Sequence, residues 1–292
     1  MTDARNSAAR ASNMITPCLA HDALLADIAA ARRETDAFHL WWLGQSGFLL
    51  LWQDRFLLMD PYLSDSLTRK YAGTDNPHVR MTELAVAPQR LDFINVVTSS
   101  HNHTDHLDAD TLLPLMSVNP DLAIVVPAAN REFAASRLRT GEDRLLPIDD
   151  GQTLEAGGFS LHAIPSAHES VERDELGRCR YLGYIVRVGD RTIYHCGDTV
   201  RYEGMAERLS PWNIDVALLP INGRSPQRRV AGNLWGHEAA ALARDAGAKL
   251  AIPCHYGMFA FNTASTDEFV RAANQLGQRF ELLQCGQRYS GR

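Results

Sequence analysis

The sequence predicts an α/β fold whose sheets are not purely parallel. Short apolar runs separated by glycine-containing turns dominate residues 38–59 and 153–195, a pattern typical of β-hairpins. Elsewhere, apolar runs as long as a strand alternate with segments whose apolar residues recur at the spacing of an α-helix. Hairpins combined with alternating strands and helices favour mixed sheets that are covered by helices.

The N-terminal 37 residues differ from the rest of the chain. Residues 1–20 are expected to form a loose arm, and 21–33 has its apolar side chains on one face, which predicts an amphipathic helix. No low-complexity run or Pro/Ser-rich linker interrupts the remaining sequence. We therefore divide the chain into an N-terminal arm and helix (1–37) and one domain (38–292).

The first half of the domain is predicted to begin with a three-stranded meander. Three apolar runs at 38–43, 48–52 and 55–59 are separated by turn residues, and Asp60-Pro61 ends the third. The elements expected next are a buried strand (93–98), a helix (111–116), a strand (122–126) and a helix (130–137).

The second half is predicted to combine hairpins with a second α/β region. Two antiparallel pairs over 153–164 and 181–195 each turn at a glycine-containing dipeptide. The elements expected after them are a strand (216–219), a helix (237–246), a strand (250–253), a helix (267–276) and a strand (280–283).

Composition excludes several classes of function. The 292 residues are 45% hydrophobic and 22% charged, as in an ordinary globular protein, and the formal net charge of -6 argues against nucleic-acid binding. No apolar run is long enough to span a membrane, and the N-terminus lacks the apolar segment of a secretory signal. The five cysteines are scattered without CxxC spacing, which suits a reducing compartment. We expect a cytoplasmic protein that acts on a small molecule. Whether it forms a homo-oligomer is left open.

The strongest functional signal directly follows the apolar run 93–98. His101, His103, Asp105 and His106 lie within six residues. Side chains two apart in extended chain share a side, so the first two histidines can face one ion while the other two residues turn toward a neighbouring position. Imidazole and carboxylate ligands suit zinc, manganese or iron better than calcium. This density predicts a metal site rather than solvent-exposed or helix-capping histidines.

Three further candidate ligands follow other predicted strands. His168, Asp198 and His255 each come shortly after an apolar run, and a glycine precedes Asp198 where a carboxylate would approach a crowded centre. Each is a weak signal alone, because a polar residue at a strand end is usually structural. Together they lie past the carboxyl ends of strands, where open α/β sheets place their sites.

The pattern resembles a known family. HNHTDH at 101–106 matches the HxHxDH motif of the metallo-β-lactamase superfamily, and the three later ligands come in the expected order. WWLGQSGF at 41–48, DPYLSDS at 60–66 and PINGR at 220–224 are similar to the branch that contains L-ascorbate-6-phosphate lactonase. The resemblance extends from residue 38 to the C-terminus. It implies an αβ/βα four-layer sandwich that hydrolyses a lactone or a related ester or amide.

The resemblance also implies a centre with two divalent metal ions, zinc or manganese, with iron as the alternative. Carried over by position, one ion would be held by His101, His103 and His168, the other by Asp105, His106 and His255, with Asp198 between them. In lactonases of this branch a carboxylate can occupy the position of His168. Asp60 looks like a carboxylate that orients a ligand histidine, and a simple Asp-Pro turn is the alternative.

The expected chemistry is hydrolysis by a metal-activated hydroxide. Asp105 or Asp198 would accept the proton of the nucleophile and pass it to the leaving oxygen. Arg224, Arg228 and Arg229 are candidates for binding an anionic group of the substrate, because guanidinium forks fit phosphate and carboxylate. A solvent-facing charged loop is the alternative for each arginine. Two other functions stay open: a phosphodiesterase of the same fold, and an iron-binding redox or regulatory protein without hydrolytic activity.

Overall fold

A seven-stranded mixed sheet forms one half of the structure, a computed structural model that describes residues 14–230 and 232–292. Its strands follow the spatial order β13 (Arg288–Gly291), β1 (Phe38–Gly44), β2 (Gly47–Trp52), β3 (Arg55–Met59), β4 (Val96–Thr98), β5 (Ala123–Pro127) and β6 (Leu145–Ile148). Neighbours from β13 to β3 are antiparallel, and neighbours from β3 to β6 are parallel. The predicted meander is the antiparallel part.

A six-stranded mixed sheet forms the other half. Its strands follow the order β12 (Leu250–Cys254), β11 (Val216–Pro220), β10 (Arg191–His195), β9 (Leu182–Val188), β8 (Phe159–Pro165) and β7 (Thr153–Ala156). The first three are parallel to one another, and β10 to β7 are antiparallel neighbours. Both predicted hairpins are therefore present, and the prediction of mixed sheets is confirmed.

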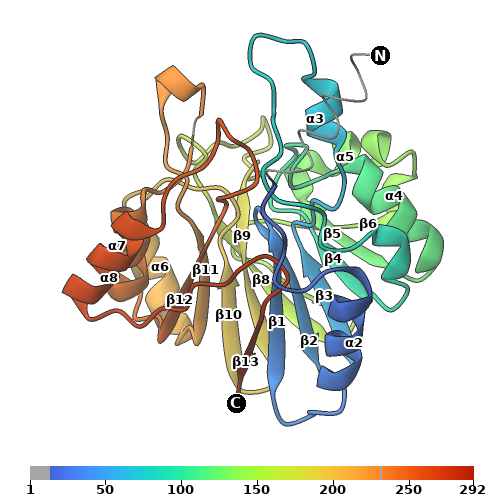
Figure 1. The fold of residues 1–292 in the computed structure, drawn as a ribbon, viewed down its shortest axis with the longest axis horizontal. Helices are drawn as coiled ribbons and strands as arrows, with labels where there is room; N and C mark the ends of the chain where they lie inside the picture. The colour runs from blue at the N-terminus through green and yellow to red at the C-terminus, as the bar shows by residue number, and fades with distance from the viewer. Residues whose placement is uncertain (1–13, 231) are drawn as a thin grey trace.

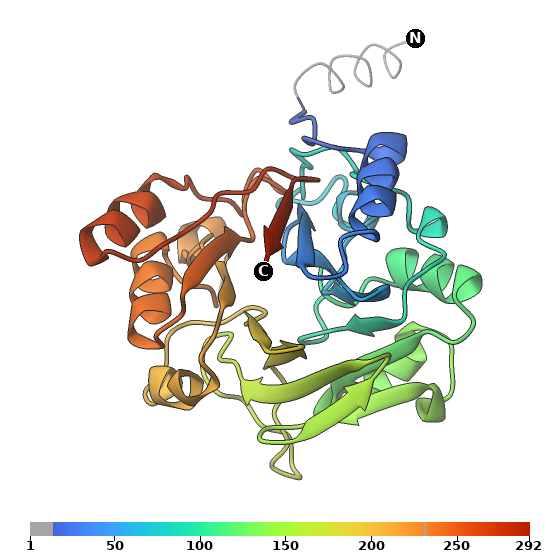
Figure 2. The same ribbon diagram turned by 90° about the horizontal axis from the view of Figure 1, so that it is seen from below.

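Helices cover the outer face of each sheet, so that the molecule has four layers (Figures 1 and 2). Packed on the first sheet are α2 (His21–Ala31), α4 (Ala109–Val118) and α5 (Arg131–Arg137). Packed on the second are α6 (Met205–Leu209), α7 (Gly236–Asp245) and α8 (Asp267–Leu276). The short α3 (Ser66–Lys70) lies in the connection between β3 and β4. This arrangement confirms the expected αβ/βα sandwich.

Alternating side chains divide the first sheet between two cores. Trp41 and Leu49 face the cluster shared with α2 and α4, whereas Leu40 and Leu50 face the second sheet. Every residue of β1 is buried, because both faces of the strand are covered. Among the described residues, no helix is long and apolar enough to cross a membrane.

The C-terminal end of the chain differs from the prediction. Residues 280–283 do not form a strand of either sheet, and Phe280 makes only an isolated bridge to Ala251. The apolar side chains of this segment pack against the cores instead, which gives an apolar pattern without a hydrogen-bonded ladder. The last strand is β13, an edge strand that pairs with β1. Its residues are mostly polar, so its sequence contains no apolar run that would predict a strand.

Three other elements were not predicted: β6, α3 and α6 are each four or five residues long. The predicted strand 93–98 is shorter, since only its last three residues form β4. The helix predicted over 21–33 is α2. Residues 1–13 of the predicted arm lie outside the described residues.

Candidate metal centre

The seven predicted ligands lie together at the edge where strands of both sheets end. Four are in the loop between β4 and α4, and the others follow β8, β10 and β12. Their ligand atoms form three overlapping groups, each within 4.8 Å: His101, His103 and His168; His101, His106 and Asp198; Asp105, His106 and His255. The structure therefore brings every predicted ligand to one place.

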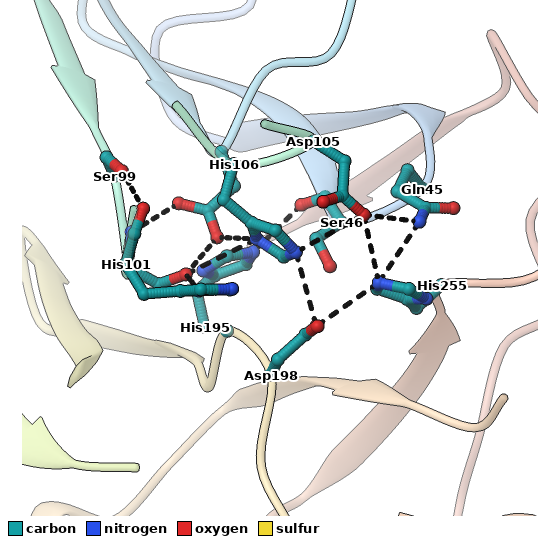
Figure 3. Close-up of polar contacts among 12 residues, drawn as sticks. Gln45, Ser46, Ser99, His101, Asp105, His106, His195, Asp198 and His255 are labelled. Carbon is teal, nitrogen blue, oxygen red and sulfur yellow. Dashed lines mark hydrogen bonds and ion pairs between the residues drawn. The ribbon is translucent and has the colours of Figure 1, made fainter. Parts of the chain in front are cut away.

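Four of these atoms, from Asp105, His106, His255 and Asp198, are here called the tetrahedral group, because four of the distances among them are close to those of a tetrahedral metal site. Asp198 Oδ1 lies 3.3 Å from His106 Nε2 and 3.2 Å from His255 Nε2 (Figure 3). Asp105 Oδ2 lies 3.7 Å and 3.5 Å from the same two nitrogens. Ligand atoms around an ion with bonds of about 2.0–2.1 Å are roughly 3.3–3.4 Å apart. These four distances, from 3.2 to 3.7 Å, are compatible with ligands of one ion of this size.

The other three histidines form an adjoining group. The ring centroids of His101 and His168 lie 4.6 Å and 4.7 Å from that of His103. Asp198 faces this group as well, because its Oδ2 is 3.8 Å from His168 Nε2 while its Oδ1 lies beside His106 and His255. A carboxylate with one oxygen toward each group can bridge two ions.

Burial and charge favour a divalent cation here. His101 Nε2, His106 Nε2 and Asp198 Oδ1 are buried without a hydrogen-bond partner among the described residues. Burial alone would lower the pKa of His255, but the carboxylates of Asp198 and Asp105 raise it to about 9. Burial would raise the pKa of Asp198, but His255 and His106 hold it well below its usual range. Buried imidazole and carboxylate atoms without hydrogen-bond partners, in residues whose charges stabilise one another, are a donor set that fits zinc, manganese or iron.

Asp60 orients one of the histidines. Its Oδ2 is 2.6 Å from His106 Nδ1, and both side chains are fully buried. Asp60 Oδ1 accepts a hydrogen bond from the main-chain N–H of Ser100 at 2.7 Å, which fixes the carboxylate. A proton held on Nδ1 leaves the Nε2 lone pair directed into the centre. The predicted orienting role of Asp60 agrees with these contacts.

Unusual backbone conformations support the centre. Gln45, Asp60 and His255 have φ angles of 51°, 43° and 61°, a left-handed region that residues other than glycine rarely adopt. Gly197 has a φ of 62°, and a Cβ at this position would lie 2.5 Å from the Cβ of Ser100. The glycine before Asp198 therefore permits the close approach that the sequence suggested.

A cavity of about 530 Å³ opens beside the two groups of ligands. Four of the predicted ligands line it: His103, Asp105, His168 and Asp198. It also contains cationic and aromatic side chains, namely Lys70, Arg137, Arg229, Tyr71, His78, Phe133, Phe259 and Phe261. A small molecule in this cavity would lie next to the candidate metal positions.

The three predicted substrate-binding arginines have different surroundings. Arg229 lines the cavity and pairs with the exposed Asp75 at 2.8 Å. The guanidinium of Arg224 instead makes two hydrogen bonds to Glu238, at 2.6 Å and 2.8 Å, and is not part of the cavity lining. Arg228 also lies outside the lining and donates to main-chain carbonyls. The structure therefore brings only Arg229 to the candidate centre.

Some residues of the site were missed by sequence reasoning. Lys70 and Arg137 belong to α3 and α5, and nothing in the sequence separates them from other surface cations. Gln45 lies in the turn between β1 and β2, where its amide contacts Asp105 and His255. Glutamine between two largely apolar runs is a usable signal, but the glycines on either side of it predict only a turn.

Comparisons with known proteins agree with this geometry. The family model for the beta-lactamase superfamily domain matches residues 55–256. A UPF0173 metal-dependent hydrolase of Saccharolobus solfataricus is 27% identical over 250 residues, which are 84% of this chain and 96% of the relative. A UPF0173 metal-dependent hydrolase of Methylobacterium nodulans is 30% identical over 243 residues, 81% of this chain and 92% of the relative.

A similar solved structure is that of a possible metal-dependent hydrolase from Veillonella parvula. It has a TM-score of 0.68 and 19% identity, and the match covers 86% of this chain and 98% of that chain. At this identity the likeness concerns the fold alone, which is the metallo-β-lactamase fold described above. The family match covers more than half of the chain and includes all seven candidate ligands. The chain therefore belongs to the metallo-β-lactamase superfamily, as a metal-dependent hydrolase of the UPF0173 family.

Proposed function

We propose that the protein is a two-metal hydrolase that opens a lactone, or cleaves a related ester or amide, in a small anionic molecule. One observation carries the proposal: two adjoining groups of ligand atoms share Asp198 at the wall of a cavity. In this proposal His101, His103 and His168 hold one ion. The second ion is held by the tetrahedral group, whose members are Asp105, His106, His255 and Asp198.

The bound ions would supply an activated water and polarise the carbonyl oxygen of the substrate. The residues of the chain orient these parts and move the proton. Asp105 and Asp198 both line the cavity, and their side chains are 17% and 6% exposed. Asp105 is therefore the better placed of the two to exchange a proton with a leaving group in the cavity, and Asp198 is the better placed to hold both ions.

The charge of the substrate is inferred from the cavity lining. Lys70, Arg137 and Arg229 are cations in a chain whose net charge is negative. Arg137 Nη1 donates to the main-chain carbonyls of Asn102 and Leu107, so its guanidinium is held against the loop between β4 and α4, which carries four of the candidate ligands and is called the ligand loop. These cations would attract a carboxylate or phosphate. We assign the leading anion contact to Arg229; substrate binding by Arg224 and Arg228 stays a prediction.

An aromatic wall would accommodate the carbon skeleton of the substrate. The rings of Tyr71 and His78 are stacked with centroids 3.9 Å apart, and the ring of Phe261 lies 4.3 Å from that of His78. Such surfaces favour apolar or planar groups. No nucleic-acid or membrane partner is part of the proposal. We also propose a cytoplasmic location, since all five cysteines are free thiols, which suits a reducing compartment.

A substrate screen tests this function. Protein purified without chelator would be analysed for metal and then assayed with lactones, carboxylic esters, amides and phosphodiesters, each in neutral and anionic forms. The proposal predicts turnover of an anionic carbonyl substrate. A preference for phosphodiesters would instead support the phosphodiesterase, which the three cations also favour. Iron content with no hydrolysis of any class would support the redox or regulatory alternative.

A further inference from the structure

We propose that Gln45 is a positioning residue of the metal centre, whose side-chain amide holds Asp105 and thereby sets the metal affinity of the tetrahedral group. Gln45 Nε2 donates to Asp105 Oδ2 at 2.8 Å and lies 3.1 Å from His255 Nε2 (Figure 3). The amide therefore contacts two of the four atoms around the candidate metal position. This inference rests on the metal centre of the proposed function.

The main chain fixes Gln45 at this position. Its carbonyl accepts hydrogen bonds from the main-chain N–H of His255 and from Trp42 Nε1, both at 2.9 Å. Gln45 is thus connected to His255 through both its main chain and its side chain. These bonds join the β1–β2 turn of one sheet to the end of β12 in the other, so the amide reaches the centre without solvent exposure.

Two energetically unfavourable features of Gln45 indicate that its amide has a functional role besides forming the turn. Gln45 has a φ of 51°, which glycine or asparagine adopts more readily, and its Oε1 is buried with no hydrogen-bond partner among the described residues. A glycine at this position would avoid both the strain and the unpartnered oxygen. Strained and unsatisfied groups persist where surrounding contacts enforce them, most often at functional sites.

The positioning role of Gln45 depends on Asp105, which accepts the hydrogen bond from its amide. Of the two contacts of the amide nitrogen, the one to Asp105 Oδ2 is the shorter, at 2.8 Å against 3.1 Å to His255 Nε2, and an ionised carboxylate oxygen can only accept a hydrogen bond. A metal ion on His255 Nε2 would occupy the lone pair of that nitrogen, so Asp105 Oδ2 would remain the acceptor of the amide N–H. The bond would hold this oxygen at its ligand position in the least enclosed part of the group, since the Asp105 side chain is 17% exposed.

The alternative role for Gln45 is that of a further ligand. Turning the amide would place Oε1, instead of Nε2, 2.8 Å from Asp105 Oδ2, a spacing that is repulsive unless a cation lies between the two oxygens. A donor and a ligand respond oppositely to a negative charge. Glutamate at position 45 would repel Asp105 if the amide is a donor, and would bind the ion more tightly if the oxygen is a ligand.

Metal titration of the whole protein tests the proposal. Metal-free wild type, Gln45→Leu, Gln45→Glu and Gln45→Asn would be titrated with Zn²⁺ against a chromophoric chelator, and Co²⁺ absorption would report the geometry of each site. Gln45→Asn keeps a residue that tolerates the left-handed turn but shortens the reach of the amide. We expect each variant to weaken one of two sites by roughly 10- to 100-fold and to leave the other unchanged.

Gln278→Leu is the matched control. Gln278 is also buried, and its amide donates to the carbonyls of Ala248 and Arg279, outside the candidate centre. This variant should lower the melting temperature without changing either metal affinity, which separates loss of a buried amide from loss of ligand positioning. Unchanged Zn²⁺ affinities in folded Gln45→Leu and Gln45→Asn, or tighter binding by Gln45→Glu, would overturn the positioning role. Wild-type protein that takes up no metal would instead overturn the proposed function.

Discussion

Asp60 Oδ2 and His106 Nδ1 lie 2.6 Å apart, and neither side chain is exposed to solvent. The pair connects the end of β3 to the ligand loop after β4, two segments that are adjacent because their strands are parallel neighbours. A buried carboxylate on one nitrogen fixes the tautomer and the orientation of the ring, and so directs the other nitrogen toward the metal position.

Replacing Asp60 by asparagine should weaken metal binding while the ligands themselves are unchanged. The expected loss in Zn²⁺ affinity is roughly 10- to 100-fold, because His106 loses its charged acceptor. Asp108→Asn is a suitable control. This buried aspartate is the N-cap of α4, and its carboxylate accepts hydrogen bonds from the hydroxyl groups of Ser66 and Thr111 and not from a ligand. If Asp60→Asn and Asp108→Asn bind Zn²⁺ with equal affinity, Asp60 has only a structural role.

Metal affinity should increase with pH up to about 9. In the metal-free protein, the pKa of His255 is raised to about 9 by Asp198 and Asp105 against the effect of burial, so its ring carries a proton at neutral pH. A metal ion must displace that proton, and each displaced proton lowers the apparent affinity about tenfold per pH unit below the pKa. Calorimetry with Zn²⁺ in buffers of different ionisation enthalpy measures the protons released. An affinity that is constant from pH 6 to 9 would contradict this electrostatic description.

The anion contact should depend on Arg229 more than on Arg224. Arg229→Ala is expected to lower kcat/KM for an anionic substrate by roughly three- to tenfold, since the contact is solvent-exposed, and to leave a neutral analogue nearly unaffected. Arg224→Ala removes a guanidinium bonded to Glu238 and should lower thermal stability without selecting between the two substrates. Steady-state kinetics with the anionic substrate and its neutral analogue measures both effects. An equal loss of kcat/KM for the two substrates in Arg229→Ala would reject the anion contact.

Local patterns predicted the parts of the structure that local forces determine. The ligand loop at 101–106 and the meander before it are visible because dense His/Asp spacing and short apolar runs need no knowledge of distant residues. His168, Asp198 and His255 could be placed with them because each follows the carboxyl end of a strand, and the ends of strands that run in the same direction meet at one edge of a sheet.

Features that depend on long-range pairing were not predictable in this way. β13 is mostly polar and becomes a strand only because it pairs with the edge of β1, whereas three of the four residues 280–283 are apolar and yet the segment forms only one bridge. Arg224 resembled an anion-binding residue, but Glu238, which occupies its guanidinium, lies on a separate helix. The contact of Gln45 with Asp105 joins residues 60 positions apart, which a turn motif cannot reveal.

Metal dependence of hydrolysis is the direct test of a two-metal centre. Metal-free protein would be titrated with Zn²⁺ or Mn²⁺ while hydrolysis of the best substrate from the screen is followed and bound metal is counted. We predict no turnover without metal and full turnover as the second equivalent binds, because two adjoining groups of ligands share Asp198. Undiminished turnover by protein shown to contain no metal would contradict hydrolysis by a metal-activated water.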